Sequence, residues 1–183
     1  MNESTNDEEA MFQDTYKFRK TLSKSNIVEI SAGIFVIIVF LLYAYLFKDK
    51  PVLLPIGSVL TAGGGLYIIL YIIRNSMRKG EIPPKDEKLD YFKYWIEWYE
   101  NTNKLLRSVF WWYLLPIIPG FIAFTIGMAQ SVPGKSLLML LILVPTALIG
   151  GGGVYWLNRY YASKKLQIRI DKLREWISAL ESK

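Results

Sequence analysis

The feature that most constrains this 183-residue chain is a set of long stretches without charge. No acidic or basic residue occurs between Arg107 and Lys135, a run of 27 residues, and a helix of that length can cross a membrane. Three further apolar blocks have spanning length. Four spans are therefore predicted, at 27–47, 52–73, 109–128 and 137–157. A soluble domain this small could not shield four such helices from water, which indicates a membrane protein.

The basic residues predict how the spans are oriented. Of 22 Lys and Arg, 19 precede the first span, lie between the second and third, or follow the fourth. Only Lys48, Lys50 and Lys135 fall in the two short connections. Because cytoplasmic loops carry the excess of basic residues, we expect both termini and the middle segment in the cytoplasm. The net charge of +6 then reflects topology and attraction to membrane lipids, and no nucleic-acid partner is expected.

The chain is expected to be an all-α polytopic membrane protein, with two parallel transmembrane hairpins and cytoplasmic helical extensions of spans three and four. Its expected parts are a polar N-terminal segment (1–26), a first transmembrane hairpin (27–73), a cytoplasmic linker (74–85) and a second hairpin with a cytoplasmic stalk (86–183).

The entrance to the first span carries a capping pattern. Residues 1–10 lack apolar periodicity and are expected to be disordered, and 11–25 are expected to lie near the membrane surface. Asn26 and Glu29 then fit a capping box that begins the first span. An intramembrane carboxylate also suggests ion or proton handling, so that role of Glu29 stays open beside capping.

The third span joins a polar, aromatic helix that is predicted to begin at Asp86 as its N-cap. Its candidate partner-binding residues are Trp95, Trp98 and Tyr99, because Trp and Tyr most often carry binding energy. The alternative is that the chain itself or lipid headgroups cover them. After the fourth span an apolar seam recurs by four and three, and it is predicted to pack antiparallel against the aromatic helix. The seam comprises Leu166, Ile170, Leu173, Ile177 and Leu180.

Two glycine runs mark candidate helix packing, since small residues let helices approach closely in lipid. They comprise Gly63, Gly64, Gly65, Gly150, Gly151, Gly152 and Gly153. Sliding the sequence by about 88 residues overlays the two runs, which suggests a weak internal repeat of two parallel hairpins. Between the runs, Pro116, Pro119 and Gly120 predict a kink in the third span.

The chain contains no Cys and no His, which removes thiol and imidazole chemistry and the usual zinc and haem ligands. No catalytic residue, metal ligand or cofactor is predicted, and the chain is expected not to be an enzyme. The leading hypothesis is a membrane protein that presents a cytoplasmic helical surface to a protein partner or to a second copy. The alternative is an oligomeric small-solute transporter or channel, which repeats and helix breaks favour but which the lack of mid-bilayer charge pairs disfavours.

Two motifs in the second half suggest a family. Leu106-Arg107-Ser108 with Trp112-Tyr113-Leu114-Leu115-Pro116 and Pro119-Gly120, together with Leu157-Asn158-Arg159 and the segment 165–171, resemble a family of small, uncharacterised bacterial inner-membrane proteins. The resemblance implies a location in the bacterial cytoplasmic membrane. Members of that family occur beside sigma-factor genes, which implies a regulatory setting, and the resemblance brings no catalytic residues.

Overall fold

The computed structural model describes residues 3–77, 82–84, 88–132 and 134–181. All of its regular elements are helices and no strand occurs in these ranges, so the all-α prediction is confirmed. In chain order the elements are α1 (Glu3–Leu46), α2 (Leu53–Met77), α3 (Lys88–Arg107), the π-helix η1 (Phe110–Leu114), α4 (Ile118–Ser131), α5 (Ser136–Tyr160), the π-helix η2 (Tyr161–Leu166) and α6 (Gln167–Glu181).

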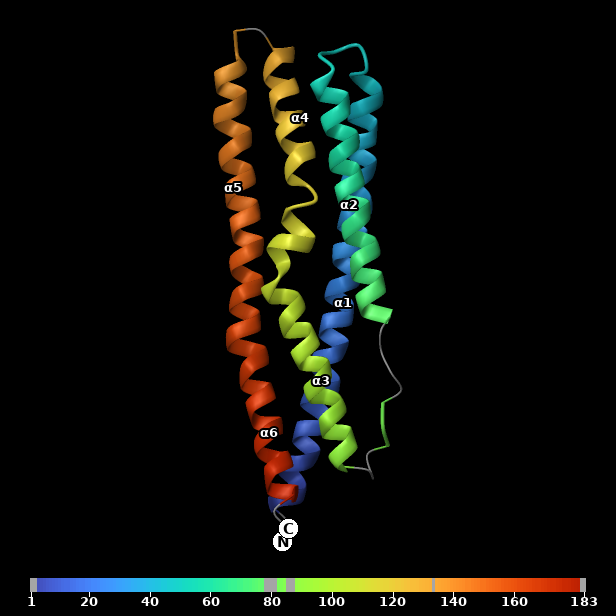
Figure 1. Cartoon of the computed structure of the whole chain (residues 1–183), viewed down its shortest axis with the longest axis vertical. Coiled ribbons are helices and arrows are strands. Elements are labelled where there is room, and N and C mark those ends of the chain that lie inside the picture. The colour runs from blue at the N-terminus through green and yellow to red at the C-terminus, as the bar shows by residue number, and fades with distance from the viewer. Residues whose placement is uncertain (1–2, 78–81, 85–87, 133, 182–183) are drawn as a thin grey trace.

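The helices form one elongated bundle with two distinct ends (Figure 1). Both chain termini lie at one end, here called the termini end, and the two short connections lie at the other, the turn end. From the termini end α1 rises, α2 returns, the column of α3, η1 and α4 rises again, and α5 with η2 and α6 returns. Near the turn end α1, α2, α4 and α5 lie together, whereas near the termini end the bundle consists of α1, α3 and α6.

Three helical stretches are long and apolar enough to cross a membrane: Phe12–Leu46, Leu53–Asn75 and Ser136–Ala179. Their most apolar windows have mean hydropathies of 2.5, 1.9 and 2.2. The structure thus supports a membrane protein with transmembrane helices. The fourth apolar helix, α4, has 14 residues, and at 1.5 Å per residue it extends only about 21 Å, less than the thickness of a hydrocarbon core.

The structure contradicts two predictions for the N-terminal segment, the disorder of residues 1–10 from Glu3 onward and the capping box at Asn26 and Glu29. A single helix runs from Glu3 to Leu46, so Asn26 and Glu29 lie in the middle of α1 and form no cap at its start. The reason is a short apolar stripe that the chain's own helices cover. Thr15 and Phe18 are buried, and Phe12 and Leu22 pack at the edge of the same core. Residues at this spacing share one helix face, and packing that face keeps the helix unbroken into the span.

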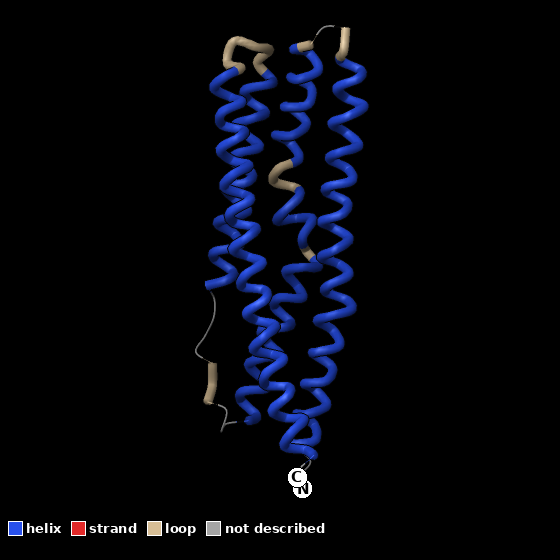
Figure 2. The backbone as a smooth tube through the Cα atoms, turned by 180° about the vertical axis from the view of Figure 1, so that it is seen from behind, coloured by secondary structure: helices blue, strands red, loops and turns tan. Residues whose placement is uncertain are grey.

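The kink predicted at the prolines is present. The helix column ends at Leu114 and resumes at Ile118, with Pro116 in the gap and Pro119 in the first turn of α4. Each proline lacks a backbone donor, and a turn bond from Ile117 N–H to the Leu114 carbonyl, at 3.1 Å, bridges the break. Figure 2, seen from behind, shows loop segments interrupting this column while the neighbouring column of α5, η2 and α6 continues unbroken.

At the termini end, α3 packs against η2 and α6, as the aromatic helix and the apolar seam predict. Three of the seam residues, Leu166, Ile170 and Leu173, are buried in the shared core, and Ile177 packs at its edge. The side chain of Leu180 lies outside the described residues, as does Asp86, the predicted N-cap.

Candidate functional site

The three candidate partner-binding residues lie in or beside an aromatic core at the termini end. Trp95 and Tyr99 are each 1% exposed, and the cluster around them combines Phe18 of α1 with residues of α3, η2 and α6. Their rings are in contact, with the Trp95 and Tyr99 centroids 6.1 Å apart and the Phe18 and Tyr99 centroids 5.6 Å apart. The chain itself therefore covers Trp95 and Tyr99. Trp98 is half-buried and packs against the outside of the cluster.

Electrostatic contacts tie the three helices of this core together. The Arg169 guanidinium of α6 lies 4.3 Å from the ring centre of Phe18 and donates hydrogen bonds of 3.0 and 3.1 Å to the Asp14 carboxylate of α1. Arg174 donates a 2.6 Å hydrogen bond to Glu100 of α3. Burial raises the pKa of Tyr99 to about 12, and the Thr15 hydroxyl and the nearby Arg169 charge offset only part of that rise. The Tyr99 hydroxyl thus stays protonated at neutral pH.

Trp98 borders a groove between α1, α2 and α3 with a volume of about 560 Å³. The groove is more polar than the aromatic core, because Asn26, Asn75 and Asn101 contribute to its wall. Asn75 is held in place by a 2.9 Å hydrogen bond from its side-chain nitrogen to the Tyr71 carbonyl. Of the three candidate partner-binding residues, Trp98 alone lines this groove.

The tightest helix contact in the bundle joins α2 and α4, and it depends on four glycines. A Cβ atom on Gly57 would collide with the backbone of Phe124, and one on Gly64 would collide with the Pro116 carbonyl. From the other side, a Cβ on Gly120 would collide with the Thr61 backbone, and one on Gly127 with the Leu54 backbone. Two helix backbones therefore meet here without intervening side chains.

Of the seven glycines proposed for packing, Gly64 lies in the α2–α4 contact, and Gly65 faces the Ile37 side chain of α1. Gly63 and three glycines of the second run, Gly150, Gly152 and Gly153, have nothing within 4 Å beyond their own helix, and Gly151 meets only the Leu114 side chain. Gly57, Gly120 and Gly127 also lie in the α2–α4 contact, outside the two glycine runs predicted to pack. The sequence signal for this contact is a seven-residue spacing of glycines, 57 to 64 on one helix and 120 to 127 on the other. Residues seven apart lie on the same face of a helix.

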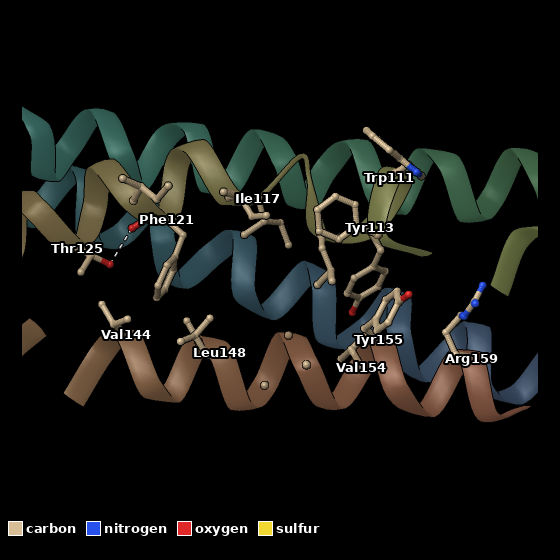
Figure 3. Close-up of a pocket in the computed structure, with 18 of the residues that line it drawn as sticks. Trp111, Tyr113, Ile117, Phe121, Thr125, Val144, Leu148, Val154, Tyr155 and Arg159 are labelled. Carbon is tan, nitrogen blue, oxygen red and sulfur yellow. Dashed lines mark hydrogen bonds between the residues drawn. The ribbon is translucent and has the colours of Figure 1, made fainter. Parts of the chain in front are cut away.

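A cleft with a volume of about 1230 Å³ lies between the column of η1 and α4 and the neighbouring α5 (Figure 3). The α4–α5 cleft has apolar walls over most of its length, and no residue of α5 is buried. The Thr125 hydroxyl inside it is already bonded to the Phe121 carbonyl at 2.8 Å. Tyr113 and Tyr155 face each other across the cleft, and Arg159 extends from α5 near one end.

The charged residues of the α4–α5 cleft are Arg107 and Arg159, and its lining includes no Asp or Glu. Neither arginine forms an ion pair within the described residues. Two hydrogen bonds in series orient the Arg107 side chain. Its Nε donates to Asn103 Oδ1 at 3.2 Å, and the buried Asn103 side chain donates to Gln167 Oε1 of α6 at 3.3 Å. The cleft therefore combines an apolar length with positive charge at its termini end. Such an arrangement can bind an amphipathic anion.

Within the described residues no group of three or more carboxylates or other ligating side chains could hold a metal ion. Comparison with protein-family models, with curated proteins and with solved structures finds no match to this chain. The family resemblance of its second half and the internal repeat therefore stay predictions.

Proposed function

We propose that this chain is a four-span membrane protein of the bacterial cytoplasmic membrane that acts by binding a protein partner on the cytoplasmic side. In this proposal α1 with α2 and α4 with α5 form two transmembrane hairpins, with η1 and the turn after it completing the third crossing. The distribution of basic residues supports placing the termini end in the cytoplasm. The three-helix bundle of α1, α3 and α6 is then the cytoplasmic part.

The observation that carries the proposal is the aromatic core that joins α1, α3 and α6. Each of these helices continues from a predicted span, so the core makes the cytoplasmic bundle a rigid extension of the membrane part. Trp98 remains half-buried beside the groove formed with α2. A Trp at the edge of a preformed groove is the kind of residue that anchors an interface, because it buries a large rigid area at modest entropy cost.

A photo-crosslinking amino acid placed in the groove tests the proposal. Introduced at Asn101, which lines the groove, it should yield one protein adduct of defined mass in membranes. Introduced at Lys93, which is exposed on the same helix outside the groove, it should not. The change Trp98→Ala should remove the Asn101 adduct while the purified protein still folds, with a melting temperature lowered only by the lost ring contacts with Trp95 and Tyr99. Equal adducts from both positions, or none from Asn101, would contradict the proposal.

Transport of a small solute is the second candidate, and the break in the helix column at Pro116 favours it. Interrupted helices often line transporter binding sites, because their ends offer unpaired backbone groups to a substrate. Against it, the charged side chains that line the α4–α5 cleft lie at the termini end, and its remaining length is apolar. Solute flux into liposomes that contain the purified protein would distinguish this function from partner binding.

A further inference from the structure

The α4–α5 cleft has features of an amphipathic binding site that the proposed association function does not use. Its volume of about 1230 Å³ exceeds the roughly 300 to 1,000 Å³ of ordinary small-molecule pockets. It lies between two predicted spans, so in a membrane its open side faces lipid. Water is disfavoured against apolar walls, so an apolar occupant fills the space.

The size of the cleft argues against a transmembrane helix as the occupant. A helix with its side chains is about 10 to 12 Å wide, and along the roughly 21 Å length of α4 it would occupy about 1,600 to 2,400 Å³. The cleft, at about 1230 Å³, could enclose only part of such a helix. Acyl chains are thinner than a helix and adapt to an irregular groove. Gly150 and Gly152 support this view, because both line the cleft and leave a wall without side chains.

The positive charge at the termini end of the cleft favours a lipid with an anionic headgroup. Arg107 and Arg159 both line that part of the cleft, and the lining includes no Asp or Glu. Hydrogen bonds from Arg107 to Asn103 and from Asn103 to Gln167 hold the Arg107 side chain in place. Trp111 and Tyr155 lie on the same lining, and aromatic side chains of this kind favour the headgroup layer. Basic pockets between transmembrane helices on the cytoplasmic side bind anionic headgroups.

We propose that the α4–α5 cleft binds an anionic phospholipid of the cytoplasmic leaflet. Its phosphate lies between the guanidinium groups of Arg107 and Arg159, and its acyl chains run along the groove toward the turn end, past Gly150 and Gly152. The lipid completes the packing of α5, none of whose residues is buried by the chain itself.

Native mass spectrometry of the full-length protein in mild detergent tests this site, with phosphatidylglycerol and phosphatidylcholine of identical chains as probes. Phosphatidylglycerol should bind at least tenfold more tightly. The double change R107Q/R159Q should weaken phosphatidylglycerol binding on the order of 30-fold, because each basic residue near the surface contributes about a fivefold gain. Arg74→Gln is the matched control, since Arg74 lies at the end of α2 outside the cleft, and it should change binding less than twofold.

A second pair of variants tests the groove itself. Gly151→Leu extends a side chain toward Leu114, which lines the cleft from the other side, and should weaken the binding of both lipids, whereas Gly63→Leu adds the same side chain to an open helix surface elsewhere and should not. Inorganic phosphate at millimolar concentration should fail to displace phosphatidylglycerol. Three outcomes would overturn the proposal: equal binding of the two lipids, equal behaviour of the two leucine variants, or displacement by inorganic phosphate, which would indicate a bare anion site. A disulfide dimer formed by Val144→Cys in membranes would also overturn it, because a second copy would then occupy the cleft.

Discussion

The close approach of α2 and α4 predicts that a single added methyl group at Gly57 destabilises the protein. Gly57→Ala would place a Cβ atom against the backbone N and Cα of Phe124. A neighbouring side chain could rotate away, but a backbone can yield only if the two helices separate. Gly63 is the matched control, because it lies in the same helix, has nothing within 4 Å and receives the same methyl group in Gly63→Ala.

The expected difference between these two variants follows from the structure. Forcing extra carbon into a packed interface costs about 1 to 3 kcal/mol. The gain in helix propensity from Gly to Ala, about 1 kcal/mol at most, occurs in both variants and cancels. Gly57→Ala should therefore unfold with a free energy about 1 to 3 kcal/mol below that of Gly63→Ala.

Unfolding of the purified protein by sodium dodecyl sulfate in mixed micelles, followed by tryptophan fluorescence, measures this difference. The Gly63→Ala variant should match the parent protein or exceed its stability slightly. If Gly57→Ala and Gly63→Ala unfold at the same detergent fraction, the helix backbones do not meet at Gly57 and the reasoning fails.

Three further predictions concern the aromatic core at the termini end. Burial raises the pKa of Tyr99 to about 12 from its usual 10, so the free energy of unfolding should be constant below pH 10 and fall by about 3 kcal/mol as the pH rises from 10 to 12. In thermal unfolding over the same pH range, the Tyr99→Phe variant should show a smaller fall. Trp95→Ala should cost about 3 to 5 kcal/mol in chemical unfolding, whereas Trp156→Ala, at a side chain that is 63% exposed, should cost less than about 0.5 kcal/mol. Asp14→Asn removes the exposed ion pair with Arg169 and should cost under about 1 kcal/mol in the same assay.

The charge-free runs predict most of the membrane part, because length and composition alone decide whether a helix can cross hydrocarbon. The proline positions likewise predict the break before α4, since a missing backbone donor acts locally. The start of α1 could not be read in the same way. Asn26 and Glu29 have the side chains of a cap, but packing of Phe12 and Phe18 on distant helices outweighs that local preference. The sequence signal for this packing is that residues 12, 15, 18 and 22 share one face of a helix.

The sequence predicts the helices better than it predicts where two helices come into close contact. A run of glycines on one helix says nothing about which of them meets a partner, since that depends on how two helices cross. Gly64 meets the Pro116 carbonyl, whereas its neighbour Gly63 points to open space. Trp95 and Trp98 differ in the same way: three residues apart on one helix, one is fully buried and the other borders a groove.

The most direct test of the proposed architecture is the side of the membrane on which each connection lies. The natural chain has no Cys, so single cysteines can be introduced without background. In intact cells a membrane-impermeant maleimide should label Lys48→Cys and Lys135→Cys at the turn end, and should label Lys172→Cys on α6 only after the membrane is opened. Labelling of Lys172→Cys in intact cells, or protection of Lys135→Cys, would show that the chain does not cross four times with its bundle in the cytoplasm.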